Sequence, residues 1–287
     1  MRVVDTHLHL WDPEELEYEW LDGALAARFG EVEVFEEQLV GVDDEVSIFV
    51  QAETVQSRFV DEVAWVERTA DAAGVVAIVA GARLDRGRET AAHLDRLAAH
   101  ERVVGVRHLL QDERAGLATS SAFLDGARLV AQRGWTFDAC VRSSQLSDVT
   151  ALADAVPDLP IVLDHLGKPA VGTADVPERP SAQWLRDLRD LAAQPRVRVK
   201  LSGLPAESGG RWTRDQVDPF LDAALDVFGP ARLLWGSDWP VSSITSAGYD
   251  IGSRTRWYRT VADWARERGL DADGLFWSNA LEFYGIR

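Results

Sequence analysis

Apolar, strand-like runs alternate with helix-like segments along almost the whole chain. The strand-like runs lie near residues 2–9, 46–51, 75–81, 103–109, 135–140, 160–165, 197–203 and 232–237, and the helical patterns lie near 57–73, 88–100, 121–133, 145–155, 181–193, 214–228 and 254–268. Eight strands that alternate with helices over about 250 residues are typical of the (β/α)8 TIM barrel of the α/β class. A doubly wound open sheet has a similar rhythm, but no glycine-rich phosphate loop follows the first strand. We therefore expect residues 1–287 to form one barrel domain.

The composition excludes several classes of partner and site. The 287 residues carry 30 basic and 47 acidic side chains, a formal charge of −17, so neither nucleic acid nor an anionic membrane surface is an expected partner. The chain has no run of about 18 apolar residues and no signal-peptide pattern, so we expect a cytoplasmic protein without a membrane-spanning helix. Cys140 is the only cysteine, which excludes an internal disulfide and a cysteine-rich zinc site.

The first predicted strand ends in Asp5-Thr6-His7-Leu8-His9. Because alternate side chains of a strand share a face, His7 and His9 should point the same way, with Asp5 behind them on that face. Two imidazoles at the end of a buried strand can converge on one metal ion or one reacting group. Two histidines that merely fall in an apolar strand explain this motif alone equally well. We expect Asp5 to hold a histidine rather than to react.

Further polar residues fall at the predicted ends of later strands, where a barrel of this kind carries its functional groups. They are Gln51 and Glu53 after the second strand, Arg107 and His108 on the fourth, Asp164 and His165 on the sixth, Lys200 on the seventh and Asp238 on the eighth. Each has a plain alternative: His108 could be a core histidine or face outward, opposite to Arg107, and Asp238 could cap a turn. Coincidence explains one such residue more easily than several, so we predict a shared site.

Lysine usage and three long connections add to this picture. The chain has 28 arginines but only two lysines, Lys168 and Lys200, and both fall in segments at strand ends. Since arginine and lysine are not interchangeable at a tight site, both lysines are candidates for a specific role. The connections Asp12–Val40, 169–180 and 239–253 are expected at the mouth of the barrel, where the first could act as a lid or contact the substrate.

A series of motifs, in order over nearly the whole chain, resembles the amidohydrolase superfamily. The motifs are Val4-Asp5-Thr6-His7-Leu8-His9-Leu10-Trp11, Val50-Gln51-Ala52, Gly105-Val106-Arg107-His108-Leu109-Leu110-Gln111-Asp112-Glu113, Phe137-Asp138, Leu163-Asp164-His165-Leu166-Gly167-Lys168-Pro169, Lys200-Leu201-Ser202-Gly203-Leu204, Leu234-Trp235-Gly236-Ser237-Asp238-Trp239-Pro240, and Asn279-Ala280 with Phe283-Tyr284. As a set they are similar to the amidohydrolase-2 branch, which includes sugar lactonases and pyrone-dicarboxylate lactonase, and above all to its L-fuconolactonase-like and L-rhamnonolactonase-like members. The resemblance implies a distorted, amidohydrolase-like barrel that hydrolyses a lactone, with an aldono-1,4- or 1,5-lactone of carbohydrate metabolism as the expected small-molecule substrate.

The resemblance also implies a set of site residues. The family's histidines and its last-strand aspartate map to His7, His9, His165 and Asp238, a set suited to one divalent ion, with zinc as the expected metal. There is no carboxylated-lysine signature for a two-metal centre, and because some relatives in the branch work without metal, metal-independent catalysis remains an alternative. Asp238 is the expected general base, which later returns the proton to the leaving alkoxide.

The remaining roles follow from what lactone hydrolysis requires. Negative charge on the carbonyl oxygen needs the metal or a cationic site, which protonated imidazoles with Lys200 or Arg107 could form, and His108 could assist or bind substrate. A hydroxyl-rich lactone calls for amide, carboxylate and indole partners. The substrate-binding candidates are Gln51, Glu53, Asp138, Trp11 and Trp239, together with Arg107.

Other functions fit the same residues. A metal-dependent decarboxylase of an aromatic or unsaturated acid would use Asp238 to protonate a carbanion. A lactonase for a dicarboxylated pyrone would need at least two arginines in the cleft, for which Arg107 and Arg142 are candidates. A non-catalytic ligand-binding barrel is disfavoured because His7, His9 and Asp238 are all present. By analogy with other barrels of this size, a homodimer is an open expectation.

Overall fold

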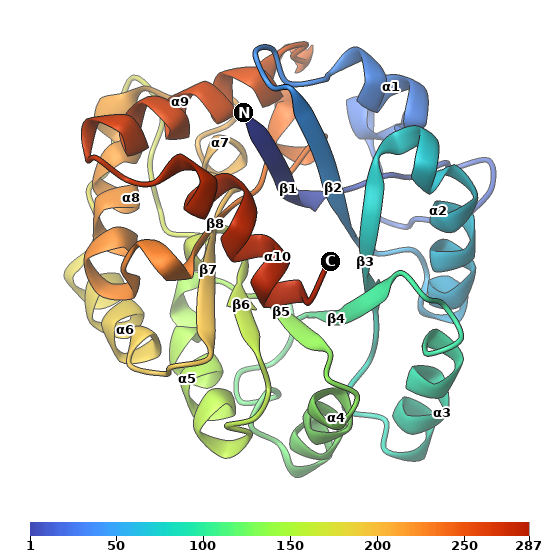
Figure 1. Cartoon of the computed structure of the whole chain (residues 1–287). Coiled ribbons are helices and arrows are strands. Elements are labelled where there is room, and N and C mark those ends of the chain that lie inside the picture. Colours follow the sequence, from blue (N-terminus) through green and yellow to red (C-terminus); the bar gives the residue numbers. More distant parts are fainter. Residues whose placement is uncertain (287) are drawn as a thin grey trace.

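The computed structural model describes residues 1–286, and its centre is a parallel eight-stranded barrel (Figure 1). Its strands are β1 (Arg2–Leu8), β2 (Asp44–Val50), β3 (Val75–Gly81), β4 (Val103–Leu109), β5 (Thr136–Cys140), β6 (Ile161–Leu163), β7 (Val197–Leu201) and β8 (Leu233–Trp235), paired in sequence order. Past the end of β8 the chain returns to β1: Asp238 N donates to His7 O at 2.8 Å, and His9 N donates to Trp239 O at 2.8 Å. The predicted (β/α)8 barrel is confirmed.

An outer ring of helices covers the strands, and each helix packs through one apolar face. The ring is formed by α2 (Phe59–Ala73), α3 (Arg88–Leu97), α4 (Ser121–Gln132), α5 (Leu146–Ala155), α6 (Ala182–Ala192), α8 (Arg214–Phe228) and α9 (Ser253–Glu267). In α2, Phe59, Val63, Val66 and Ala70 recur at helical spacing and are buried. The helix ends at Gly74, whose φ of 67° is the left-handed conformation that glycine adopts readily.

Three strands end earlier than the sequence pattern predicts. The apolar runs suggested strands up to His165, Gly203 and Ser237, whereas β6, β7 and β8 stop at Leu163, Leu201 and Trp235. After β6 the chain turns through a short 3-10 segment, η4 (Asp164–Gly167), in which His165 has a φ of 54°. A strand cannot continue through such an angle. His165 and Asp238 therefore stand on turns just beyond β6 and β8.

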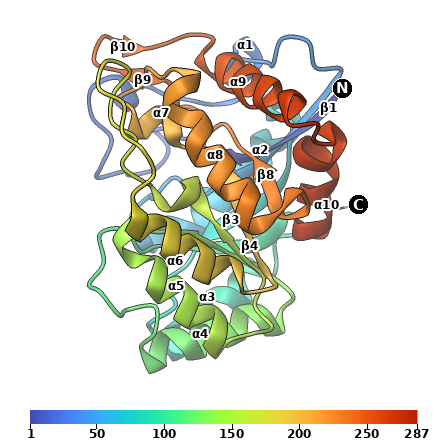
Figure 2. The same cartoon turned by 90° about the vertical axis from the view of Figure 1, so that its left-hand side faces the viewer.

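A short helix closes the amino-terminal end of the barrel, an element that the sequence analysis did not predict. It is α10 (Asn279–Tyr284), preceded by the π-helical turn η7 (Gly274–Ser278), and it lies across the barrel axis in Figure 1 and at the end opposite the loops in Figure 2. Its Ala280 and Tyr284 pack on strand residues that point into the barrel. These strand residues are Val4, Ile48, Val50, Ala77, Val79, Val162 and Leu234.

The opposite end, the mouth, carries the long connections, as predicted. They contain the short helix α1 (Glu31–Glu36) and a hairpin of β9 (Ile244–Thr245) with β10 (Gly248–Tyr249), and the short helix α7 (Leu204–Glu207) follows β7. The first connection is fixed to the β2–α2 loop, because Trp20 Nε1 donates to Ala52 O at 2.8 Å and Thr54 Oγ1 donates to Glu17 O at 2.7 Å. Within residues 1–286, the helices are too short or too polar to span a bilayer.

The strand β1 corrects one prediction. Asp5 does not share the face of His7: its Oδ2 pairs with Arg254 of the outer helix α9 at 2.8 Å, and both side chains are fully buried. The register of β1 against β2 shifts between Asp5 and Leu8, and such an irregularity changes the phase of the side-chain alternation. Asp5 meets His7 only through the main chain, where Oδ1 accepts from His7 N at 3.1 Å.

Candidate active site

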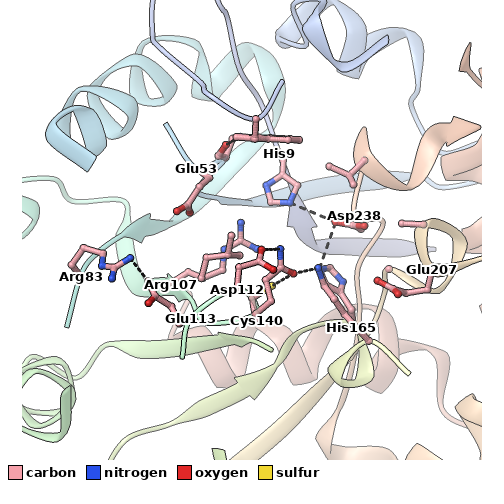
Figure 3. A pocket seen from close by; sticks show the side chains of 18 residues that line it. His9, Glu53, Arg83, Arg107, Asp112, Glu113, Cys140, His165, Glu207 and Asp238 are labelled. Carbon is pink, nitrogen blue, oxygen red and sulfur yellow. Dashed lines mark hydrogen bonds and ion pairs between the residues drawn. The ribbon is translucent and has the colours of Figure 1, made fainter. Parts of the chain in front are cut away.

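A cavity of about 560 Å³ opens at the mouth, and all eight strands or the turns after them contribute to its wall (Figure 3). Carboxylates, cations and two imidazoles dominate the lining. The polar and aromatic lining residues are His9, Trp20, Glu53, Arg83, Arg107, Gln111, Asp112, Glu113, Cys140, His165, Lys168, Glu207 and Asp238. A concave site of this size with converging polar groups is where a small ligand binds in such a barrel.

Three imidazoles surround one carboxylate oxygen at the base of the cavity. Asp238 Oδ1 lies 3.5 Å from His9 Nε2 and 3.7 Å from the Nε2 atoms of both His7 and His165. Figure 3 shows His9 and His165 directed at Asp238 from opposite sides. The structure thus brings together the predicted set of His7, His9, His165 and Asp238. These residues come from the end of β1, from η4 and from the turn after β8.

The other polar atoms of these side chains are held by hydrogen bonds. Val50 O lies 2.7 Å from His9 Nδ1 and Ser202 Oγ lies 2.9 Å from His165 Nδ1, while Ser242 Oγ donates to Asp238 Oδ2 at 2.8 Å. A carbonyl oxygen can only accept, so His9 Nδ1 donates to Val50 O, and Nε2 is the ring nitrogen that faces Asp238. Partners of this kind orient the imidazoles of metal centres.

The donor set fits one divalent ion. Three imidazole nitrogens and one carboxylate oxygen are ligands that zinc accepts, and ligand bonds of about 2.0–2.1 Å imply ligand atoms about 3.4 Å apart in a tetrahedron. The observed nitrogen–oxygen separations of 3.5–3.7 Å are close to this value. His7, His9 and Asp238, and separately His7, Asp164 and His165, each bring ligand atoms within 4.8 Å of one another.

Burial favours the neutral form of two of the imidazoles, His7 and His165. It lowers the pKa of His165 to about 4, against the opposing charges of Asp238 and Asp164, and it lowers the pKa of His7 well below its usual value. Burial alone would raise the pKa of Asp238, but the surrounding histidines, His165 first, hold it well below its usual range. Neutral imidazoles bind metals, and these shifts oppose a cationic form of His7 and His165.

A fully buried network of charges lies beneath His7. Lys200 Nζ pairs with Asp138, lies 3.0 Å from Asp164 Oδ1, and lies 3.1 Å from His7 Nδ1. Tyr284 of α10 donates its hydroxyl proton to Asp138 Oδ2 at 3.1 Å, which links the network to the closed end of the barrel. Lys200 and Asp138 do not line the cavity, so their contacts are with the charged network and not with a ligand.

The remaining predicted site residues occupy different positions. Glu53 and Arg107 line the cavity, and Gln51 lies behind Glu53, to which its Nε2 donates at 2.8 Å. His108 faces the outer helices, where its ring stacks on Phe123 of α4 at 5.4 Å. Its Nδ1 accepts from Leu84 N at 3.3 Å, so the structure does not bring His108 to the cavity.

Neither predicted indole reaches the cavity. Trp11 Nε1 donates to Leu25 O and Ala27 O, and Trp239 Nε1 donates to Tyr249 Oη at 2.8 Å. Trp11 instead packs edge-on against Trp20, with ring centroids 5.4 Å apart, and Trp20 is the indole that lines the cavity. Trp20 lies in the connection predicted to contact substrate, but nothing in the sequence distinguished it from Trp11.

Several lining residues were not singled out as site residues. Arg83 follows β3, Gln111, Asp112 and Glu113 follow β4, Cys140 is the last residue of β5, and Glu207 follows β7. Their position at or after strand ends is the signal that the sequence offers for them.

Backbone strain concentrates at this site. Within residues 1–286, the non-glycine residues with positive φ are Glu53, His165, Leu166, Lys168 and Asp238, and all but Leu166 line the cavity. Strained conformations of this kind persist where the surrounding structure fixes them, often at functional sites. The neighbouring turn leaves no room for a side chain, because a Cβ on Gly203 would lie 2.4 Å from His165 Nδ1.

Comparisons with known proteins agree with this geometry. The amidohydrolase family model matches residues 4–286. The chain is 33% identical to L-fucono-1,5-lactonase of Burkholderia multivorans and 32% identical to that of Burkholderia ambifaria, over 99% of this chain and 96% and 95% of those proteins. A crystal structure of an amidohydrolase from Burkholderia multivorans with bound zinc superposes with a TM-score of 0.81 at 30% identity, over the full length of both chains. This chain is therefore a member of the amidohydrolase family.

Proposed function

We propose that this chain hydrolyses the ring ester of a sugar lactone, with Asp238 as general base. The observation that carries the proposal is the convergence of three imidazole nitrogens on Asp238 Oδ1 at the base of a polar cavity. Its support from relatives is the full-length similarity to two L-fucono-1,5-lactonases. Lactonase activity agrees with the polar lining, since a sugar lactone presents hydroxyl groups on most of its ring carbons.

Asp238 handles the proton. In the reaction, the oxygen of water adds to the carbonyl carbon, the ring carbon–oxygen bond breaks, and a hydroxy acid is released. The carboxylate of Asp238 is ionised and accepts the proton of the attacking water, then returns a proton to the leaving oxygen. Ser242 fixes Oδ2 at 2.8 Å, which leaves Oδ1 as the oxygen that faces the imidazoles and the reacting water.

We further propose that His7, His9, His165 and Asp238 hold one divalent ion, with zinc the expected metal. When bound, such an ion supplies Lewis acidity toward a carbonyl oxygen and increases the acidity of water. The chain itself orients the ligands: Val50 and Ser202 contact His9 and His165, and Lys200 and Asp164 both lie next to His7 Nδ1. We assign Lys200 this positioning role, and we assign His108 no contact with the substrate.

The cavity charge favours a neutral lactone over a dicarboxylated one. Arg83 is paired with Glu113 at 2.6 Å, and Arg107 lies 3.5 Å from Asp164. Arg142, the second arginine that a dicarboxylate was expected to need, pairs with Asp112 at 2.6 Å and does not line the cavity. Glu53, supported by Gln51, is suited to accept hydrogen bonds from substrate hydroxyls.

The test is a hydrolysis screen with a pH indicator over aldono-1,4- and 1,5-lactones, using protein of measured metal content before and after chelation. We expect turnover of a stereochemical subset of these lactones, about one divalent ion per chain, and loss of turnover on chelation. Release of carbon dioxide from aromatic acids, without turnover of any sugar lactone, would replace the proposal with a decarboxylase. Full activity of metal-free protein would refute the metal centre alone.

A further inference from the structure

Lys168 lines the cavity next to the candidate centre, and the mechanism above does not use it. It stands on the turn that carries His165, with Lys168 N donating to His165 O at 2.8 Å. Its φ of 51° is a conformation that side chains larger than asparagine rarely adopt. A strained lysine, in a chain that otherwise uses arginine at all but one basic position, indicates that the position of this ammonium group matters.

Lys168 is also the cavity cation with donors to spare. Within the described part of the chain, Arg83 and Arg107, the other two cations of the lining, each face a carboxylate. Lys168 Nζ donates instead to Gln111 Oε1, a neutral acceptor. Gln111 is fixed in this orientation because its Nε2 donates to Asp112 Oδ2 at 3.2 Å. An ammonium group has three N–H donors, so two remain available to a ligand.

An acceptor lies on the same side of the cavity. Glu207 lines the cavity from α7, and Figure 3 shows it next to His165 and Asp238. Lys168 and Glu207 line the same cavity. Burial raises the pKa of the Glu207 carboxyl, and the positive charge of Lys168 opposes this shift. A hydroxyl group can accept from Lys168 and donate to Glu207 at once. A carboxylate or sulfonate can only accept, and Glu207 and Asp112 would repel it.

We propose that Lys168 and Glu207 form a subsite that binds a ring hydroxyl of the lactone, and that this subsite selects hydroxylated neutral lactones over lactones carrying a carboxylate or sulfonate group. The inference rests on the proposed lactonase function and adds the residues that determine its specificity. Lys168 acts here on a remote part of the substrate and leaves the proton transfers to Asp238.

The test compares Lys168→Met and Glu207→Gln with the wild type on an aldono-1,5-lactone and on the analogues that each lack one ring hydroxyl. Arg189→Met, on the exposed face of α6, is the matched control. We expect Lys168→Met to lower kcat/KM for the parent lactone about 10- to 100-fold, the range for a hydrogen bond to a charged group. For one deoxy lactone, the loss should nearly disappear, and Glu207→Gln should show its smallest effect on the same analogue.

Other outcomes overturn the inference. If Lys168→Met lost the same factor in kcat/KM on every analogue, Lys168 would act at the reaction centre. If it lost nothing on any analogue, Lys168 would not contact the substrate. If Lys168→Met does not fold, Lys168→Gln and the deoxy series on the wild type give the same comparison. Failure of the wild type to open any lactone would refute the proposed function itself, and this result is distinguishable because it precedes any variant.

Discussion

The two ends of this barrel are built in opposite ways. At the mouth, polar and charged side chains stand on turns with positive φ at Glu53, His165, Lys168 and Asp238. At the closed end, α10 packs Ala280 and Tyr284 on aliphatic residues of the strands. Between them, the buried charges around Lys200 connect the hydroxyl of Tyr284 to the ring of His7. The difference suggests that the closed end supplies stability, whereas the mouth accepts strain so that functional groups can converge.

The largest effect is expected from removing the proposed general base, Asp238. Asp238→Asn keeps the shape of the side chain but removes its charge, so we expect kcat for the sugar lactone to fall about 10²- to 10⁴-fold, the usual contribution of a general base. Steady-state kinetics and a thermal unfolding curve measure the two effects separately. Asp175→Asn, in the exposed 169–180 connection, is the control that should leave kcat unchanged. Retention of most of the activity would refute the role of Asp238.

Disrupting the buried charge network around Lys200 should lower the free energy of unfolding. Lys200→Met leaves Asp138 and Asp164 buried without their ammonium partner, and breaking a buried ion pair in this way costs about 3–5 kcal/mol. Denaturant unfolding of the wild type and the variant measures this loss. Adding Asp138→Asn to Lys200→Met should recover part of it, because one uncompensated charge is removed. A double variant less stable than the single one would show that the network is not organised by these charges.

The sequence predicted the periodic parts of the molecule and missed those that depend on distant contacts. Apolar spacing identified every barrel strand, and motif positions identified the residues that converge on Asp238. The face of Asp5 was wrong because a register shift in β1 against β2 is not visible in one strand alone. The closing helix α10 is six residues long, and it is explained by the strand residues that it covers rather than by its own pattern. Whether Trp11 or Trp20 lines the cavity depends on how the first connection folds, which the sequence pattern does not show.

The buried carboxyl of Glu62 on α2, which contacts the β2–α2 loop, allows a test of the mouth by pH. Burial raises the pKa of Glu62 to about 8, from a usual value of 4.5, while Ala52 N donates to its Oε1 at 3.1 Å. The folded chain therefore keeps this proton between pH 4.5 and 8 and the unfolded chain does not, so stability from this group falls as pH rises. Glu62→Gln should remove a slope of about 1.4 kcal/mol per pH unit from the free energy of unfolding.

Denaturant unfolding at several pH values between 5 and 8 checks this slope, with Glu89→Gln on the exposed face of α3 as the control. Parallel pH profiles for Glu62→Gln and the wild type would mean that Glu62 ionises normally. In that case the contact between Glu62 of α2 and the β2–α2 loop would not depend on a protonated carboxyl.

The smallest expected effect is that of Tyr284→Phe at the closed end, and it is the most direct test of whether the two ends have separate roles. Tyr284→Phe removes one buried hydroxyl from Asp138, which keeps its ion pair with Lys200, so the free energy of unfolding should fall by about 1 kcal/mol. The ring of Phe still fills the space under the strands, so kcat should stay within about twofold of the wild type. Denaturant unfolding and steady-state kinetics on the same preparation show whether Tyr284 affects stability, catalysis or both. A tenfold loss of kcat at unchanged stability would mean that the closed end reaches the chemistry through Asp138, Lys200 and His7, and that stability and function are not divided between the ends of this barrel.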